Sequence, residues 1–171
     1  MAHLLHIDSS VLTAGSTSKE IGETFRRAWA TERPDGAVIY RDLGVTPVPH
    51  ISEAVVHAMQ VPATDRTGAQ AAEAALQNEL IAEIADADAD AVLITAPMYT
   101  YSIPSGLKAW VDHILVYGRT LTPDPKDGPF FDKKITIVLS FGDGYEEGAY
   151  AARDHVRPWA PVNGVRMGHA R

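Results

Sequence analysis

The sequence of 171 residues contains no cysteine, which excludes disulfide bonds, thiolate nucleophiles and metal sites with cysteine ligands. No apolar run approaches the roughly 20 residues that a helix needs to cross a bilayer. The first residues, Met1-Ala-His-Leu-Leu5, lack the positively charged start of a secretory signal. We therefore expect no membrane association and a cytoplasmic setting.

Positive charge is also scarce. The 15 lysines and arginines form no run and are outnumbered by 22 acidic residues, for a formal net charge of −7. Nucleic acid requires a basic face on its partner, so we expect no nucleic-acid binding. The acidic segment Asp86-Ala-Asp-Ala-Asp90 lacks the glycine and the later glutamate of an EF-hand loop, which predicts a solvated turn.

Seven histidines are present, but none belongs to a His-Glu-x-x-His motif. We also expect no close i, i+4 pair of a histidine with a carboxylate, and therefore no metal site. His113 falls near the polar edge of a predicted helix. We expect it to be a surface or interface residue and not a proton donor.

What the chain does contain is typical of one α/β domain over residues 1–171, because 46% of its residues are hydrophobic. Strand and helix patterns alternate, which favours βαβ units around a parallel sheet. We expect strands at residues 3–8, 37–41, 91–95 and 134–140, helices over 53–60 and 68–85, and helices that begin near residues 19 and 107. The predicted buried faces of the two longest helices are Ile21, Phe25, Ala28 and Trp29 in one and Leu76, Leu80, Ile81 and Ile84 in the other.

The most informative segment joins a strand to a helix in mid-chain. Residues 91–95 form a continuously apolar run, as expected of a strand that is buried on both faces. The chain breaks at Pro97 and then carries Met98, Tyr99 and Tyr101 before the next helix. Open α/β sheets bind ligands beyond the carboxyl ends of their strands, so these side chains indicate a site for a planar ligand. The alternative is that the aromatic residues only cover the core.

A second junction follows the first strand, where residues 9–18 form a loop rich in hydroxyl groups. Ser18 is the predicted N-cap of the helix after it. The unpaired N–H groups of a helix start can bind a phosphate without a lysine, and Ser16, Thr17 and Ser18 would add hydroxyl donors. An ordinary capped turn is the alternative.

The fourth predicted strand ends in a third loop, Ser140-Phe-Gly-Asp-Gly-Tyr145. In a doubly wound sheet the three loops would converge on one crevice. A phosphate at the first loop and a planar ring between the other two describe flavin mononucleotide (FMN). The sequence has neither the G-x-G-x-x-G of a dinucleotide site nor a P-loop.

Taken together, Asp8-Ser-Ser-x-x-x-x-Gly-Ser-x-Ser18, Ala96-Pro-Met-Tyr-Thr-Tyr101 and Leu107-Lys108 stand in an order and spacing that resemble those of the FMN-dependent NADH azoreductases, also described as FMN-dependent NADH:quinone oxidoreductases. The resemblance runs from the first strand to about Pro158. It implies a flavodoxin-like, doubly wound parallel sheet in three α/β/α layers, with a shortened carboxyl-terminal end.

The same resemblance implies the residues of the site. The ribityl phosphate would be held by Ser10, Ser16, Thr17 and Ser18. The remaining cofactor contacts would be Pro97, Met98, Tyr99, Thr100, Tyr101, Ser140, Phe141 and Gly142. We name Tyr99, Tyr101, Phe141 and Tyr145 as candidates for lining the substrate cleft, with a core or lid role as the alternative for each.

Two departures from the family pattern stand out. The family commonly has Ser-Arg-Gly-Gly where this chain has Ser140-Phe-Gly-Asp143, which predicts a less positive pocket. The family also continues with a helix, a strand and a terminal helix after the position of Trp159. Here only residues 162–167 resemble a short strand, and Gly164 weakens that pattern.

The resemblance further implies a ping-pong reaction, in which NADH gives a hydride to the flavin and a quinone or azo compound then takes the electrons. No side chain would act as a nucleophile. It also implies a homodimer, to which residues 43–66 and Trp110 could contribute apolar contacts. Two alternatives stay open: a non-catalytic binding protein that has kept the fold but lost FMN, and a flavodoxin-type electron carrier.

Overall fold

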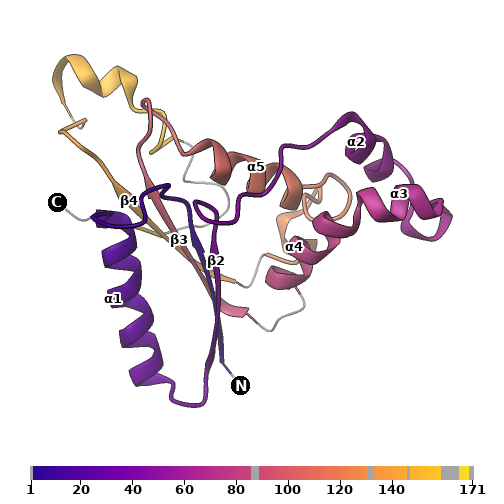
Figure 1. The fold of residues 1–171 in the computed structure, drawn as a ribbon, viewed down its shortest axis with the longest axis horizontal. Helices are drawn as coiled ribbons and strands as arrows, with labels where there is room; N and C mark the ends of the chain where they lie inside the picture. Colours follow the sequence, from indigo (N-terminus) through magenta and orange to yellow (C-terminus); the bar gives the residue numbers. More distant parts are fainter. Residues whose placement is uncertain (1, 86–88, 131–132, 146, 159–165, 170–171) are drawn as a thin grey trace.

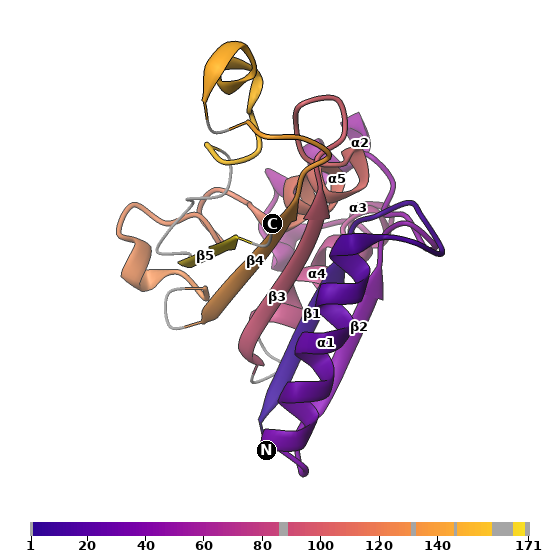
Figure 2. The ribbon, with the colours of Figure 1, turned by 90° about the vertical axis from the view of Figure 1, so that its left-hand side faces the viewer.

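The computed structural model describes residues 2–85, 89–130, 133–145, 147–158 and 166–169. At its centre is a parallel sheet of five strands in the order β2-β1-β3-β4-β5, which Figure 2 shows side by side. The strands are β1 (His3–Asp8), β2 (Ala37–Asp42), β3 (Ala89–Pro97), β4 (Lys134–Ser140) and β5 (Arg166–His169). This order is the flavodoxin-like doubly wound arrangement that the sequence predicts.

Helices lie on both faces of the sheet and make three layers (Figure 1). One face carries α1 (Thr17–Glu32), and the other carries α4 (Ala75–Ala85) and α5 (Ser105–Ile114). Two shorter helices, α2 (Glu53–Met59) and α3 (Gly68–Glu73), lie beyond α4 and α5 and pack against each other. None of the helices in the described part of the chain combines the length and apolar character that spanning a membrane requires.

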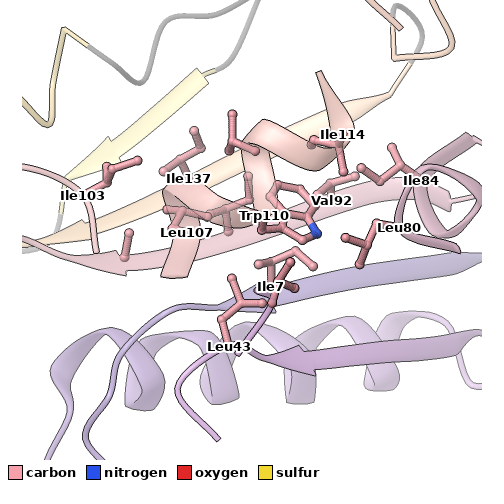
Figure 3. Close-up of a cluster of buried hydrophobic side chains, with 14 of the residues drawn as sticks. Ile7, Leu43, Leu80, Ile84, Val92, Ile103, Leu107, Trp110, Ile114 and Ile137 are labelled. Atoms are coloured by element: carbon pink, nitrogen blue, oxygen red, sulfur yellow. The ribbon is translucent and has the colours of Figure 1, made fainter. Parts of the chain in front are cut away.

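The larger core cluster lies between the sheet and the α4/α5 layer. Figure 3 shows Trp110 and Leu107 of α5 among side chains of β1, β3, β4 and α4. Residues 91–96 of β3 are all buried, which confirms the prediction of a strand covered on both faces. Trp110 is itself only 2% exposed, so the expectation that it contributes to a dimer contact is wrong for this conformation.

Helix α1 approaches the sheet through a glycine. At Gly22 a Cβ would lie 2.6 Å from the His6 ring and 2.9 Å from the Thr95 methyl group. Trp29 is buried and Ile21 and Phe25 are partly buried on the same face, as predicted. Ala28 is exposed, contrary to the prediction, because the close contact at Gly22 fixes which face of α1 meets the sheet.

The helix expected over residues 68–85 is two helices, with Ala74 between α3 and α4. Leu80, Ile81 and Ile84 are buried in the core, as predicted, while Leu76 is only partly buried. The sequence has no glycine or proline at this break. The two helices have different partners, because α3 packs against α2 and α4 packs against β3 and α5.

His113 is 2% exposed, and its Nε2 lies 3.0 Å from the carbonyl oxygen of Pro49. The expectation of a surface position is therefore wrong: the proline-rich segment after β2 folds over the end of α5 and covers this ring. His57 lies 3.4 Å from the carboxylate of Glu53, four residues earlier. The expectation that no such i, i+4 pair exists is also wrong, although both side chains are largely exposed.

At the carboxyl-terminal end, β5 begins at Arg166 and ends at His169. The short strand predicted at residues 162–167 therefore exists, although its bounds differ and residues 162–165 lie outside the described residues. Most of the acidic segment at residues 86–90 also lies outside them. In the described part of the chain, no group of three or more histidine and acidic residues is placed to hold a metal ion.

Candidate functional site

Three loops meet at the carboxyl ends of β1, β3 and β4: the serine loop (residues 9–18), the tyrosine loop (97–102) and the glycine loop (140–145). The N–H and hydroxyl of Ser9 both donate to the carbonyl oxygen of Thr95, at 3.1 and 2.8 Å. The N–H of Met98 donates to the carbonyl oxygen of Ser140 at 2.8 Å. The predicted convergence of the three loops is confirmed, and Figure 2 shows the exits of β3 and β4 at one end of the sheet.

The serine loop ends in the first turn of α1. Ser16 is the N-cap, and its Oγ accepts a hydrogen bond from the N–H of Lys19 at 3.4 Å. The prediction of Ser18 as the cap is wrong; Ser18 lies inside the first turn, fully buried, with its Oγ 3.2 Å from the Oγ of Ser16. The helix therefore starts earlier than predicted, and the N–H groups of Thr17 and Ser18 belong to the turn that lacks intrahelical acceptors.

Tyr99 joins the tyrosine loop to the serine loop. Its hydroxyl lies 3.2 Å from the Oγ of Ser10 and accepts a hydrogen bond from the N–H of Val11 at 3.2 Å. The N–H of Leu12 donates to the Oγ of Ser10 at 3.3 Å. One phenol group thus links the two loops on which the predicted phosphate and ring positions depend.

The tyrosine loop is a tight turn. Tyr99 and Ser102 exchange two backbone hydrogen bonds, of 2.9 and 3.1 Å. Between them, Thr100 and Tyr101 have φ angles of 46° and 67°, in the left-handed region that glycine or asparagine usually occupies. Backbone strain of this kind is concentrated at functional sites, and it here directs Tyr101 toward the glycine loop.

A polar network supports the serine loop from below. The hydroxyl of Tyr40 donates to Asp8 at 3.1 Å, while Lys19 forms an ion pair of 2.7 Å with Asp42. Burial raises the pKa of Asp8. Burial opposes ionisation of Asp42 as well and is the largest single influence, but the hydrogen bonds from Lys19, Gly44 and Val45 and the charge of Lys19 together outweigh it, so that the pKa of Asp42 is lowered.

Sequence reasoning did not identify this network. The available signal was an aspartate at the carboxyl end of each of two strands, residues 8 and 42, because such ends lie side by side in a parallel sheet. The register of β1 and β2 pairs these two residues.

Gly44 is a second residue that the sequence did not single out. Its N–H donates to the carboxylate of Asp42 at 2.9 Å, and a Cβ at this position would overlap the carbonyl oxygen of Ser10. The loop after β2 therefore packs directly beneath the serine loop, and only glycine allows the approach.

An aromatic cluster surrounds the other end of the site. Tyr145 lies 6.2 Å from Tyr101, 6.0 Å from Phe141 and 6.1 Å from Tyr150, measured between ring centroids. Phe141, which stands where the family commonly has arginine, has the guanidinium carbon of Arg157 4.7 Å from its ring centroid. Arg157 thus lies next to the position of the missing arginine, but it is paired with Asp154 at 2.9 Å, so the less positive pocket stays a prediction.

Two hollows adjoin these loops. One of about 460 Å³ is lined by residues 13–16 of the serine loop and by side chains of α1 together with Tyr40. Another of about 520 Å³ is lined by Tyr99, Thr100, Ser102, Ile103, Ser105 and Lys108. The tyrosine loop and the serine loop each border open space, as a binding site at this edge requires.

The family model for the flavodoxin-like fold matches residues 2–163. An FMN-dependent NADH:quinone oxidoreductase of Frankia casuarinae is 43% identical over 160 residues, which are 93% of this chain and 75% of the relative. The enzyme of the same name from Streptomyces avermitilis is 49% identical over 150 residues, 86% of this chain and 67% of the relative.

This chain belongs to the family of the FMN-dependent NADH:quinone oxidoreductases. The resemblance inferred from the motifs is thereby confirmed. Among solved structures, an azoreductase from Bacillus anthracis superposes with a TM-score of 0.84 at 20% identity, covering 99% of this chain and 86% of the other. At that identity the superposition shows a shared fold.

The residues present fit a flavin mononucleotide. Gly15 has a φ of 68° and open space where a Cβ would stand, directly before the helix start, so a phosphate could approach the first turn without obstruction. Ser16 adds a hydroxyl group at the helix start and Ser10 adds one in the same loop, bonded to Tyr99. Tyr101 and Phe141 supply flat surfaces in the two other loops. No basic side chain is needed at the phosphate, because the helix start provides the positive potential.

Proposed function

We propose that this protein is an FMN-dependent oxidoreductase that transfers electrons from NADH to quinones. The observation that carries the proposal is the hydrogen bonding of Tyr99 to Ser10 and Val11, which holds the serine loop against the tyrosine loop and supports their assignment to one site. The names of the relatives at 43% and 49% identity support the activity and the cofactor.

We assign the phosphate to Ser10, Ser16, Thr17 and Ser18. The ring would lie against Pro97, Met98, Tyr99, Thr100 and Tyr101 on one side and Ser140, Phe141 and Gly142 on the other. Tyr99, Tyr101, Phe141 and Tyr145 would line the place where the substrates bind. FMN supplies the redox chemistry when it is bound; the side chains orient the ring and exclude water from it.

Donor and acceptor would use the same place in turn, because the three loops gather at one edge of the sheet. That arrangement supports a ping-pong order of substrates. Azo compounds are included among the proposed acceptors, since they can accept electrons at the same position in two successive cycles.

We further propose a homodimer in a cytoplasmic setting. Val11, Leu12 and Val45 are 62%, 50% and 64% exposed. They lie together beside the site, since the backbone of Val11 lies close to Gly44. Exposed apolar side chains in a group favour contact with a second copy of the chain.

The test is to mix the purified protein with FMN, remove free FMN by desalting, and add NADH without oxygen while the visible spectrum is recorded. We expect the protein to stay yellow, to bleach with NADH, and to regain its colour when a quinone is added. A colourless eluate would instead favour a binding protein that has lost FMN. A yellow protein that forms a one-electron semiquinone and does not react with NADH would favour an electron carrier.

A variant links this activity to the observed geometry. Tyr99→Phe removes the hydroxyl that bonds Ser10 and Val11, so we expect the Kd for FMN to rise by about fivefold to tenfold, as for the loss of one hydrogen bond. Tyr117→Phe is the control, because Tyr117 is 82% exposed. Equal FMN affinity in both variants would contradict the assigned role of Tyr99.

A further inference from the structure

One cation beside the aromatic cluster has no ionic partner among the described residues. Arg153 ends the 3₁₀ helix Gly148–Arg153, which follows the glycine loop. Its Nη1 donates to the hydroxyl of Tyr101 at 3.2 Å. Its guanidinium carbon lies 5.5 Å from the ring centroid of Tyr101 and 5.2 Å from that of Tyr150. Two tyrosines thus hold this guanidinium beside the aromatic cluster.

Arg157, the neighbouring cation, has a different role. It forms an ion pair of 2.9 Å with the buried Asp154 and donates to the carbonyl oxygen of Tyr145 at 3.1 Å. Its charge is therefore neutralised within the fold, and it ties the glycine loop to the segment after the 3₁₀ helix. Arg153 is exposed and keeps its positive charge available.

The net negative charge of the chain makes Arg153 a local point of attraction for anions. A chain with a formal net charge of −7 repels anions in general, so a single uncompensated guanidinium beside the rings can attract an anion to this one place. One of its five N–H groups is used by Tyr101, and the remaining groups can bind an oxyanion in the planar, two-point manner of arginine.

We propose that Arg153 determines substrate specificity by binding the anionic group of a substrate whose planar ring lies among Tyr101, Tyr145 and Phe141. This inference rests on the proposed function. The anionic group is a sulfonate, carboxylate or phosphate. It belongs either to an acidic aromatic acceptor or to the nicotinamide donor, whose pyrophosphate carries the same chemistry.

Binding without turnover is the first test. The affinities of naphthalenesulfonate and of the neutral naphthol are measured by calorimetry, with and without added FMN, for the wild type, Arg153→Gln and Arg153→Lys. We expect Arg153→Gln to weaken sulfonate binding by about tenfold and to leave naphthol binding unchanged. Arg153→Lys should restore part of the difference, and salt at about 0.3 M should reduce the wild-type preference for the sulfonate.

Arg33→Gln is the matched control. Arg33 also lies over an aromatic ring, with its guanidinium carbon 4.1 Å from the centroid of Trp29, but it stands at the far end of α1. If Arg33→Gln weakened sulfonate binding as much as Arg153→Gln, or if Arg153→Gln weakened naphthol and sulfonate equally, the proposal would be overturned.

Steady-state kinetics then identify the source of the anion. If Arg153→Gln has a higher KM than the wild type for a sulfonated naphthoquinone, but the same KM for the neutral naphthoquinone and for NADH, the anion belongs to the acceptor. A raised KM for NADH assigns it to the donor. Unchanged KM values for all three would overturn the proposal. If the wild type failed to react with NADH, the proposed function would fall while the calorimetric comparison still gave its answer.

Discussion

At the scale of the residue, the serine loop is supported by two residues outside the proposed ligand contacts, Gly44 and Asp42. Gly44 supports the serine loop because its lack of a side chain lets the loop after β2 approach the carbonyl oxygen of Ser10. Asp42 holds that approach through the N–H groups of Gly44 and Val45, at 2.9 and 3.2 Å. The loop after β2 therefore helps to determine the shape of the proposed phosphate site.

We expect Gly44→Ala to destabilise the protein by about 1–3 kcal/mol and to weaken FMN binding, because the added methyl group displaces the serine loop. The free energy of unfolding in urea and the Kd for FMN measure the two effects. Gly68→Ala is the control, since a Cβ there meets nothing within 4 Å and residue 68 begins a helix. A Gly44→Ala protein with unchanged affinity for FMN would show that the serine loop does not need this support.

His6 gives the protein a dependence on pH. The ring is fully buried, with Nε2 3.1 Å from Thr95 Oγ1. Burial, assisted by the positive charge of Arg26, lowers its pKa from 6.5 to about 4. In the unfolded chain the ring takes up a proton near pH 6.5, whereas in the folded protein it stays neutral down to about pH 4. Stability is therefore lost as the pH falls through this window.

Between pH 7 and 5 we expect His6 to account for a loss of about 2 kcal/mol in the free energy of unfolding. Urea titrations across that range, compared between the wild type and His6→Gln, isolate the contribution. The variant should be less stable at pH 7 but show a shallower decline. Parallel declines would contradict the burial of a neutral His6.

At the scale of the element, two helices begin with a serine N-cap, but only one of them lies at the proposed site. Ser16 caps α1, and Ser52 caps α2, where it accepts a hydrogen bond from the N–H of Val55 at 3.2 Å. Both caps satisfy a backbone N–H of the first turn, but only the start of α1 lies at the proposed phosphate position.

We expect Ser16→Ala and Ser52→Ala each to lower stability by about 1 kcal/mol, while only Ser16→Ala lowers the affinity for FMN. Thermal denaturation measures the first effect and fluorescence titration with FMN the second. If Ser52→Ala weakened FMN binding equally, the loss would reflect general destabilisation and not the cap at the site.

At the scale of the whole molecule, the exposed group of Val11, Leu12 and Val45 indicates where a second copy would dock. We expect sedimentation to give twice the mass of one chain, and Val45→Asp to shift the equilibrium toward the monomer by placing a charge in the contact. Val38→Asp is the control, because Val38 is also partly exposed, at 37%, but lies on the edge strand β2. A monomeric wild type would contradict the proposed homodimer.

The sequence by itself determined the central strands, the fold class and the convergence of three loops at one edge of the sheet. Unbroken apolar runs such as residues 91–95 bury equally well on both faces, and loops after parallel strands must gather at one edge. The resemblance in the serine and tyrosine loops then identified the family. These signals are local, so they can be read along the chain.

Only the tertiary structure decided the rest. It determined that Ser16 and not Ser18 caps α1, that α3 and α4 are separate, and that Gly22 and not Ala28 faces the sheet. It also brought Gly44 beneath Ser10 and placed Arg153 against Tyr101. Apart from the cap, which is local, each of these features depends on contacts between segments or layers whose relative position no local pattern encodes, because packing between elements selects among alternatives that are nearly equal in local energy.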